Sequence, residues 1–481
     1  AKEVKDRLTF VLANERGFFW DGRYASACAD SLALDAKLLK RLAVKLKGLL
    51  TTPQRKTEPR GQEATRRLTF FVNSLLMDLP PPPPLDAAVS LTTLTPFYSE
   101  DVILSEADLR KKNSDGVTTL LYLQTLYKAD WRAFLERRGI DDHAARDAVF
   151  SAKHSTETRL WASFRAQTLA RTGEGIMQNE AALRWLARLE RVNDARRSRR
   201  RAGAPKTSRL YAAACDESPT HPQISLDDLL KLKFGYVVTC QIYGRQSAQQ
   251  DPKAKDIEML LKRFPLLRVA YIDEQRVNRS GASAFYSCLV KHDAATDGPA
   301  EVYRVRLPGN AIVGEGKPEN QNHAVVFTRG ETLQTIDMNQ DGFFEEALKT
   351  RNLVQEFRGP RAPGAPPVVI VGFREHIFTG SVSSLANYMA LQELSFVTLG
   401  QRVLADPLHM RLHYGHPDIF DKLWFTTRGG VSKASRGINL SEDIFAGYTA
   451  VIRGGGVTMR EYAQVGKGRD VGMQQIYKFE A

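Results

Sequence analysis

The sequence lacks any hydrophobic run long enough to cross a membrane. A transmembrane helix needs roughly 18 or more consecutive apolar residues, and no stretch of the 481 residues reaches that length. The N-terminus also lacks the charged and apolar regions of a signal peptide. We therefore expect this chain to be soluble or peripheral to a membrane. Because it begins with Ala1 rather than Met, we also expect it to be a piece of a longer protein.

Cysteine is scarce, and no internal repeat is evident. The four cysteines, Cys28, Cys215, Cys240 and Cys288, lie far apart, and none of their spacings is typical of a metal site. Such sparse cysteines exclude a disulfide scaffold and favour reduced thiols in a cytosolic setting. The length is too great for one small domain and allows a large buried core.

Acidic residues are outnumbered by basic ones, so the chain carries a formal net charge of +13. This excess suits nucleic acid, an anionic membrane surface or a phosphate-bearing substrate. The sequence lacks the basic stripe with interleaved aromatics that single-strand binders use, so we predict no nucleic-acid partner. The amphipathic stretch 32–50 and the basic run 196–201 are hypothesised to face a membrane. The alternatives are a helix packed on its own domain and a solvated loop.

Five consecutive prolines, Pro80 to Pro84, mark the clearest boundary in the chain. They predict a stiff spacer that ends a helical arm, residues 1–85, and precedes a second region, residues 86–481. That region contains a helical and basic insertion at about 104–226, with Ser105 as an N-cap and Gly116 as a break between helices. The basic run 196–201 is expected to begin an irregular segment.

Strands and helices alternate after the insertion, which predicts one α/β mixed sheet flanked by helices. Strands are expected at 234–243, 267–272, 284–290, 300–307, 322–328, 332–336 and 368–372, with 284–290 and 300–307 antiparallel to each other. Helices are expected at 251–264, 345–358 and 383–404, and only short helices and turns after residue 411.

Polar residues follow the predicted strand 332–336. Asp337, Asn339 and Asp341 come directly after it, at the kind of strand end where open α/β sheets bind ligands. Their hard oxygen atoms suit Mg²⁺ or Mn²⁺ carrying a diphosphate. The alternative is an ordinary β-turn, because Asp, Asn and Gly are common turn residues.

Further polar motifs extend this pattern along the chain. Asp273 ends the predicted strand 267–272, and Glu442 and Asp443 open a predicted helix. A first acid can hold a nucleoside, a second group the diphosphate, and a third acid can remove a proton from an acceptor hydroxyl. Downstream amide and basic groups can steady a departing phosphate; these are Gln464, Lys467 and Arg469. A metal-dependent phosphohydrolase is an alternative, but the sequence shows no second carboxylate cluster for two metals.

In order and type, these motifs resemble the processive inverting glycosyltransferases, such as cellulose and chitin synthases. The resemblance includes a Pro-x-Tyr-x-Glu turn, here Pro96 to Glu100. Two departures are clear, since Asp337-Met338-Asn339 lacks a second Asp and the segment after Gln464 lacks Arg-Trp. Longer stretches are similar to the 1,3-β-glucan synthases, or callose synthases; among them are 66–75, 94–102, 160–172, 267–274, 314–341, 374–386, 412–420, 426–435, 440–447 and 464–472.

The resemblance implies a GT-A-like domain that transfers glucose from UDP-glucose to the 3-hydroxyl of a β-1,3-glucan chain. It implies Asp443 as the general base, with Glu442 as second choice. It also implies a cytosolic position at the plasma membrane, with the membrane-embedded part of the same protein and a small-GTPase-type regulator as partners. The substrate contacts that it implies are Tyr98, Glu100, Lys233, Asp273, Lys317, Glu375, Arg411, Gln464, Lys467 and Arg469.

Overall fold

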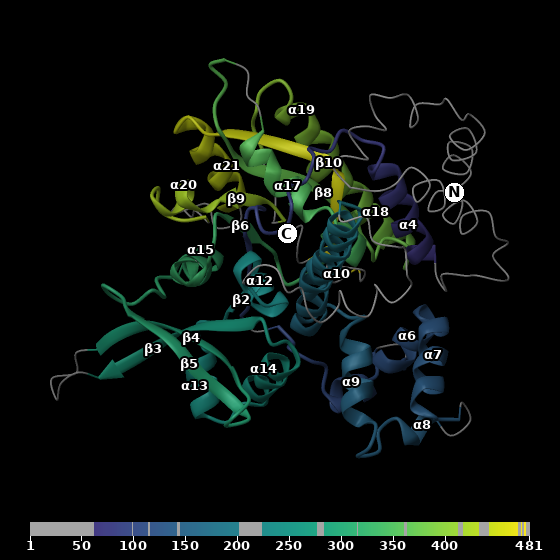
Figure 1. Ribbon diagram of the computed structural model, residues 1–481. Coiled ribbons are helices and arrows are strands. Elements are labelled where there is room, and N and C mark those ends of the chain that lie inside the picture. Colours follow the sequence, from purple (N-terminus) through teal and green to yellow (C-terminus); the bar gives the residue numbers. More distant parts are fainter. Residues whose placement is uncertain are drawn as a thin grey trace, which may run out of the picture.

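A ten-stranded mixed sheet forms the centre of the molecule in the computed structural model (Figure 1). The structure describes residues 62–98, 100–113, 116–141, 145–201, 224–276, 283–314, 316–359, 363–411, 417–431, 442–469, 473 and 476–477. Within these ranges the side chains of residues 62, 145, 146, 192–201, 442 and 443 are not described. No described helix is both long and apolar enough to span a bilayer.

The strands follow the spatial order β5-β4-β3-β2-β1-β6-β9-β8-β10-β7. Seven of them, β1, β2, β3, β5, β6, β8 and β10, run in the same direction, because β1 pairs in parallel with β2 and β6, while β4 and β9 are antiparallel to the strands on both their sides. Their carboxyl ends therefore share one edge of the sheet. The bounds are β1 Leu91–Pro96, β2 Phe234–Thr239, β3 Leu267–Arg276, β4 Ser283–Asp293, β5 Gly298–Arg306, β6 Thr332–Thr335, β7 Gln340–Asp341, β8 Val368–Ile377, β9 Ile419–Asp421 and β10 Gly456–Lys467.

The middle of the sheet is buried on both faces. Every residue of β1 is buried, as expected for a central parallel strand covered by helices on both sides. Neighbouring residues of β2 point to opposite faces, since Tyr236 and Val238 belong to one hydrophobic cluster and Val237 to the other. This alternation fixes the register, because a shift by one residue would exchange the two faces.

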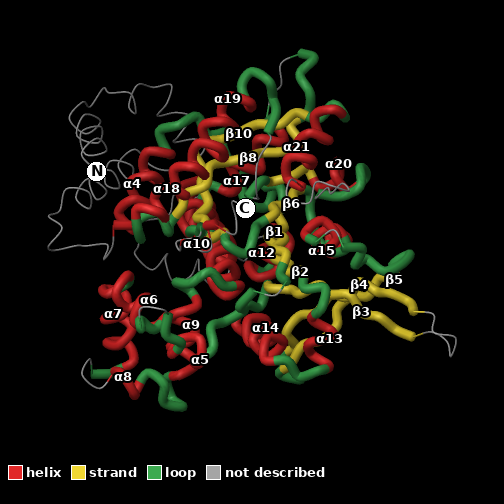
Figure 2. The backbone as a smooth tube through the Cα atoms, turned by 180° about the vertical axis from the view of Figure 1, so that it is seen from behind, coloured by secondary structure: helices red, strands yellow, loops and turns green. Residues whose placement is uncertain are grey.

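Helices cover both faces and also form a separate bundle beside the sheet (Figures 1 and 2). The bundle has its own core around Trp131, Phe134 and Trp161. It contains α5 Glu106–Arg110, α6 Thr119–Leu126, α7 Lys128–Arg138, α8 Ala145–Ala148 and α9 Ser155–Ser163. The remaining helices are α4 Gln62–Ser74, α10 Leu169–Arg201, α12 Leu226–Lys233, α13 Tyr243–Ala248, α14 Pro252–Arg263, α15 Lys317–Asn322, α16 Phe344–Ala347, α17 Thr350–Gln355, α18 Ser384–Glu393, α19 Gln401–Ala405, α20 Lys422–Thr426 and α21 Glu442–Ile452. Short 3₁₀ turns are η1 Val325–Phe327 and η2 Glu356–Arg358, and η3 Leu394–Gly400 is π-helical.

The predicted α/β class, with a mixed sheet flanked by helices, is confirmed. The antiparallel pairing of 284–290 with 300–307 is also confirmed, as β4 and β5. Ser105 caps α5 and forms a capping box with Asp108, and Gly116 adopts a positive φ between α5 and α6.

Four predicted elements were wrong. Residues 322–328 form the end of α15 and η1 rather than a strand, because their apolar residues face a core from a helical turn. The region after residue 411 contains β9 and the long strand β10, which short-range patterns did not indicate. Asp273 does not end a strand, since β3 continues to Arg276 in a hairpin with β4. The basic run 196–201 continues α10 rather than starting an irregular segment.

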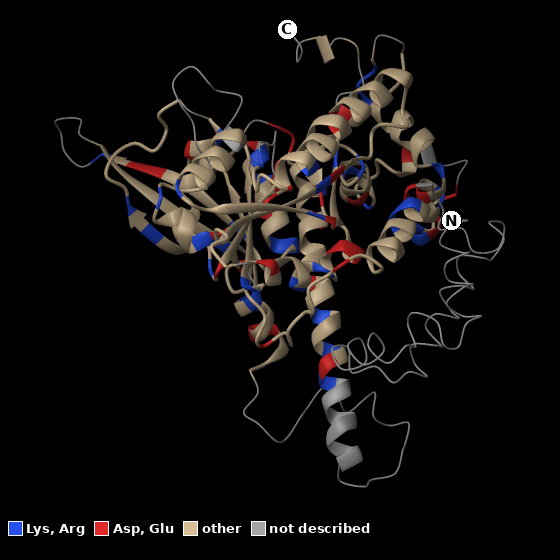
Figure 3. Cartoon of the chain, turned by 90° about the horizontal axis from the view of Figure 1, so that it is seen from above, with Lys and Arg blue, Asp and Glu red and all other residues tan. Residues whose placement is uncertain are grey.

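The charge of the described residues does not gather on one surface. Lys, Arg, Asp and Glu are interspersed, including along the described part of α10, which projects from the sheet (Figure 3). The amphipathic stretch 32–50 lies outside the described residues, as do the side chains of 196–201. The hypothesis that both face a membrane therefore stays a prediction. The proline stretch is held against α17, where Asn352 donates to Pro80 O at 2.9 Å and Arg351 to Pro83 O at 2.9 Å.

Candidate active site

A cavity of about 470 Å³ opens at the carboxyl ends of β1 and β6. The polypeptide segments around it come from four distant parts of the sequence, and the parallel strands bring their ends to the same edge. Five of the predicted site residues line this single cavity. Its lining consists of Pro96, Tyr98, Glu100, Gln167, Lys317, Asp337, Met338 and Asn339.

Lys317 and Asp337 form an ion pair in the wall of the cavity. The distance from Lys317 Nζ to Asp337 Oδ1 is 3.2 Å, and both side chains are largely buried. Lys317 begins α15 directly after Gly316, whose φ of +71° is accessible to glycine at little cost. Asp337 follows β6, and its backbone N–H donates to Gln340 Oε1 at 2.9 Å. The pair gives the cavity one ammonium and one carboxylate in fixed positions.

The turn after β1 supplies Tyr98 and Glu100. Glu100 Oε2 accepts a hydrogen bond from the Tyr98 backbone N–H at 3.1 Å. Asn320 in α15 donates to Phe97 O at 3.0 Å, which ties this turn to the helix that carries Lys317. Burial raises the pKa of Tyr98, and the neighbouring Lys317 opposes this only in part. The Tyr98 hydroxyl therefore stays protonated at neutral pH.

Asn339 offers an acceptor on the cavity wall. Its Oδ1 atom is buried and has no hydrogen-bond partner among the described residues, an arrangement that is costly unless a ligand or water completes it. The backbone around it is fixed, because Gly468 N–H donates to Asn339 O at 2.7 Å and Thr172 Oγ1 donates to Met338 O at 2.7 Å.

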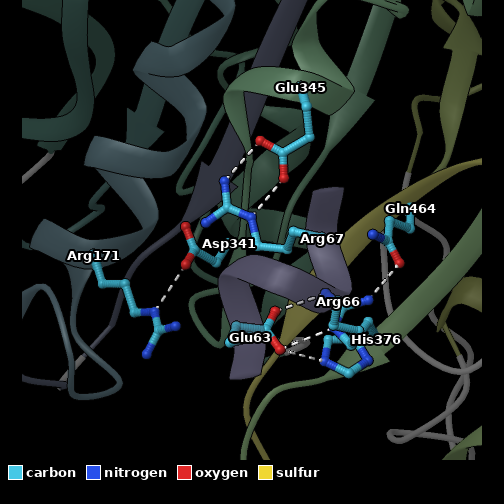
Figure 4. Close-up of polar contacts among 8 residues, drawn as sticks. All are labelled: Glu63, Arg66, Arg67, Arg171, Asp341, Glu345, His376 and Gln464. Carbon is cyan, nitrogen blue, oxygen red and sulfur yellow. Dashed lines mark hydrogen bonds and ion pairs between the residues drawn. The ribbon is translucent and has the colours of Figure 1, made fainter. Parts of the chain in front are cut away.

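Asp341 does not join Asp337 and Asn339, although all three were expected to bind a metal. It lies on β7, and its Oδ2 is 3.0 Å from Arg171 Nε (Figure 4). Burial raises the pKa of Asp341, and Arg171 opposes that effect. Asp337 and Asp341 therefore have different protein partners, and the Mg²⁺ or Mn²⁺ site stays a prediction. Within the described ranges, no three His, Cys, Asp or Glu side chains gather as metal ligands.

Glu375, Lys467 and Arg469 lie together at the same edge, behind the cavity. Glu375 on β8 contacts Lys467 on β10, with 3.1 Å between Oε2 and Nζ, and both side chains are almost fully buried. Glu393 of α18 contacts both Lys467 and Arg469. Burial disfavours the Lys467 ammonium, but Glu375 and Glu393 outweigh that effect and raise the pKa of Lys467. Glu375, predicted as a substrate contact, is thus part of a buried ion pair with Lys467.

Four other predicted contacts lie outside the cavity lining, namely Lys233, Asp273, Arg411 and Gln464. Lys233 lies just before the amino end of β2, so the six residues of that strand separate it from the carboxyl edge. Its Nζ donates to Asp86 O at 2.6 Å and to Ala88 O at 2.7 Å. Asp273 lies at the carboxyl edge, two strands from β1, and pairs with Arg304 at 2.6 Å. The structure therefore separates both side chains from the cavity lining.

Arg411 and Gln464 are interior residues with protein partners. Arg411 is 1% exposed, and its Nε lies 2.8 Å from Asp418 Oδ2. The Arg411 side chain also packs so closely against Gly372 that a Cβ atom at that position would collide with it. Gln464 Oε1 accepts from Arg66 Nη1 of α4 at 3.1 Å (Figure 4). The same helix contacts Glu345 through Arg67. Both predicted residues thus hold elements of the fold together.

The predicted base residues start α21, as the sequence indicated. Their side chains lie outside the described part of the structure, but the backbone position is informative. Only residues 453–455 separate α21 from β10, and Gly455 N–H donates to Ala450 O. The end of the helix therefore lies at the start of β10, and the helix contacts both β10 and β8.

Comparison with known proteins agrees with this geometry and with the sequence motifs. Residues 58–481 match the family described as 1,3-beta-glucan synthase component. The chain is 52% identical over 484 residues to callose synthase 9 of Arabidopsis thaliana, covering 98% of this chain and 25% of that protein. It is 49% identical over 445 residues to callose synthase 12 and 50% identical over 428 residues to callose synthase 10 of the same plant, covering 88% of this chain and 25% and 22% of those proteins.

The chain belongs to the 1,3-β-glucan synthase family. It spans about a quarter of the length of the callose synthases that it matches.

Two residues of the described chain were missed as site residues in the sequence. Gln167 lines the cavity and donates to Arg469 O at 3.4 Å, and a Cβ atom at Gly468 would lie 2.8 Å from Gln167 Cδ. Glu393 contacts the two cations behind the cavity. Neither has a local signal, because Gln167 precedes a long helix and Glu393 ends an apolar one. Only their long-range contacts distinguish them.

Proposed function

We propose that this chain is the catalytic region of a 1,3-β-glucan synthase. It transfers glucose from UDP-glucose, with inversion, to the 3-hydroxyl of a growing β-1,3-glucan chain and releases UDP. The observation that supports this most directly is the cavity at the carboxyl edge of the sheet, lined by Lys317 and Asp337. Open α/β sheets bind nucleotides at such an edge.

The cavity residues suit a nucleotide sugar. Lys317 places a positive charge where a diphosphate accumulates negative charge as its bond to glucose breaks. Tyr98 and Glu100 offer a ring, a hydroxyl and a carboxylate for the nucleoside. Asn339 Oδ1 and the Gln167 amide offer hydrogen-bonding groups for sugar hydroxyls. Lys467 and Arg469 add positive charge behind the wall of the cavity.

Asp443 is the proposed general base, and Glu442 is the second choice. An inverting transfer needs one carboxylate to take the proton of the acceptor hydroxyl, on the side opposite the departing UDP. Support comes from the connection of α21 to β10: the helix ends just before that strand begins and runs back along it, so its start lies toward the carboxyl end of β10. A carboxylate in the first turn of a helix is kept ionised by the helix dipole, which suits a proton acceptor near neutral pH.

The proposal places the chain at the cytosolic face of the plasma membrane, as part of a larger protein. Its partners are the membrane-embedded part of the same protein and a regulator of the small-GTPase type. Support comes from the relatives, which are about four times as long as this chain.

The test uses the full-length enzyme in membranes, with radiolabelled glucan from UDP-glucose as the readout. Asp443→Asn should lower glucan formation by about 10²-fold or more and leave UDP binding intact. Glu442→Gln is the matched control, and activity lost only in that variant would move the base by one residue. Normal synthesis by both variants would contradict the assignment, and no synthesis by the wild type would contradict the function.

A further inference from the structure

Glu393, the last residue of α18, binds both cations that lie behind the cavity. Its Oε1 is 2.5 Å from Lys467 Nζ, and its Oε2 is 3.4 Å from Arg469 Nε. The side chains of Glu393 and Arg469 are each 12% exposed, and that of Lys467 is 5% exposed. One carboxylate from a helix therefore fixes two cations at the end of β10.

A chain of hydrogen bonds joins this cluster to the cavity. Lys467 Nζ also contacts Glu375 Oε2 at 3.1 Å, and Glu375 Oε1 accepts from Gln340 Nε2. Gln340 Oε1 in turn accepts from the Asp337 backbone N–H at 2.9 Å. Glu375, Gln340 and Lys467 are all buried, so water screens these contacts little. The position of Lys467 is thus coupled to that of Asp337.

The helix changes its winding directly after Glu393. Residues Leu394–Gly400 form a π-helical turn, which is rare and often marks functional sites. Five of the residues that face inward are spaced by four, namely Met389, Glu393, Val397, Gln401 and Ala405, and Ala386 and Thr398 are buried beside them. A spacing of four drifts around an α-helix of 3.6 residues per turn, and the wider π turn offsets that drift. The unusual winding therefore keeps Glu393 and the apolar residues after it on the same face.

We propose that Glu393 is a positioning residue for glucosyl transfer, which holds Lys467 and Arg469 where their charge opposes the charge that develops on departing UDP. This inference rests on the proposed function. Glu393 lies behind the cavity rather than in its lining, so it acts through the two cations. Without its charge, Lys467 keeps Glu375 as its contacting carboxylate among the described residues, and Arg469 Nε loses its contact with Oε2 of residue 393.

The test is steady-state kinetics of the full-length enzyme in membranes, with UDP-glucose varied. Glu393→Gln should lower kcat by about tenfold and leave KM within about twofold, because the affected charge matters most in the transition state. Glu393→Asp keeps the charge and should recover most of the lost kcat. Glu461→Gln is the matched control, since Glu461 pairs with Arg402 and likewise joins this helical segment to β10. It should leave both constants unchanged.

Several results would overturn the proposal. These are a kcat of Glu393→Gln within twofold of the wild type, an equal loss in Glu461→Gln, or a loss seen only as a higher KM. If Glu393→Gln does not accumulate, Arg469→Gln decides, because it removes one of the two charges that Glu393 holds: a lowered kcat with unchanged KM supports the role, and any other pattern refutes it. A wild-type enzyme that makes no glucan from UDP-glucose would refute the proposed function instead.

Discussion

The carboxyl edge of the sheet carries similar polar residues in two different settings. Next to β1 and β6, Lys317, Asp337 and Asn339 line an open cavity. Next to β8 and β10, Glu375 and Lys467 are buried against each other and against Glu393. Groups in the first setting can exchange a protein partner for a ligand, while those in the second have protein partners on each side. The comparison teaches that charge at a strand end predicts a binding role only where the fold leaves space beside it.

The sharpest test of this comparison uses two lysines that were both expected to contact the nucleotide. Lys317→Met removes the ammonium from the cavity, and we expect glucan formation to fall by about 10²-fold because charge stabilisation of the leaving group is lost. Lys233→Met removes only contacts to Asp86 O and Ala88 O at the opposite edge. We expect normal activity per folded molecule, measured by radiolabelled glucan at matched protein levels. Equal losses of glucan formation in the two variants would contradict the assignment of Lys317, and not Lys233, to the binding cavity.

Arg411, an interior residue outside the cavity lining, should respond in stability rather than in activity. Arg411→Met leaves Asp418 buried without its partner, and breaking a buried ion pair typically costs about 3–5 kcal/mol. The control is Arg402→Met, which breaks the more exposed pair with Glu461 and should cost less than about 1 kcal/mol. Denaturant unfolding of the purified chain measures both. Similar costs for the two variants would show that the Arg411 site is less closed than the structure describes.

The smallest effect is expected where α4 meets β8. Burial favours the neutral form of Glu63, but hydrogen bonds with Arg66 and His376 outweigh it and lower the pKa of Glu63 to about 2 (Figure 4). A lowered folded-state pKa contributes stability above the ordinary value of 4.5, and this contribution is lost as the pH falls toward 2. Because Glu63 is 44% exposed, we expect less than about 1 kcal/mol.

Thermal unfolding of the wild type and Glu63→Gln between pH 7 and pH 3 measures this contribution. The difference in stability should be constant down to about pH 5 and then shrink as the pH falls further. A difference that grows in acid would mean that the contacts of Glu63 with Arg66 and His376 do not stabilise its charged form.

Local sequence patterns determined the α/β class, the antiparallel pair β4 and β5, the capped start of α5 and the helix that begins at Glu442. Each depends on short-range periodicity or on a cap that neighbouring residues complete. The same patterns located Asp337 and Asn339, because these residues follow a predicted strand, whereas Tyr98, Glu100 and Lys317 came from the resemblance to the glucan synthases. β10 was missed because its burial comes from pairing with β8 and contact with α21, which no nearby residue reveals.

Only the tertiary structure decided which polar residues share the cavity and which bind each other. Asp337 and Asp341 are four residues apart, yet one faces Lys317 in the cavity and the other pairs with Arg171 from α10. Lys317 and Lys233 looked alike in sequence and lie at opposite edges of the sheet. The physical reason is that the partner of a buried charge is set by chain segments more than a hundred residues away in several of these pairs. Strand order and helix packing bring those segments together, and local sequence patterns do not predict which segments will meet.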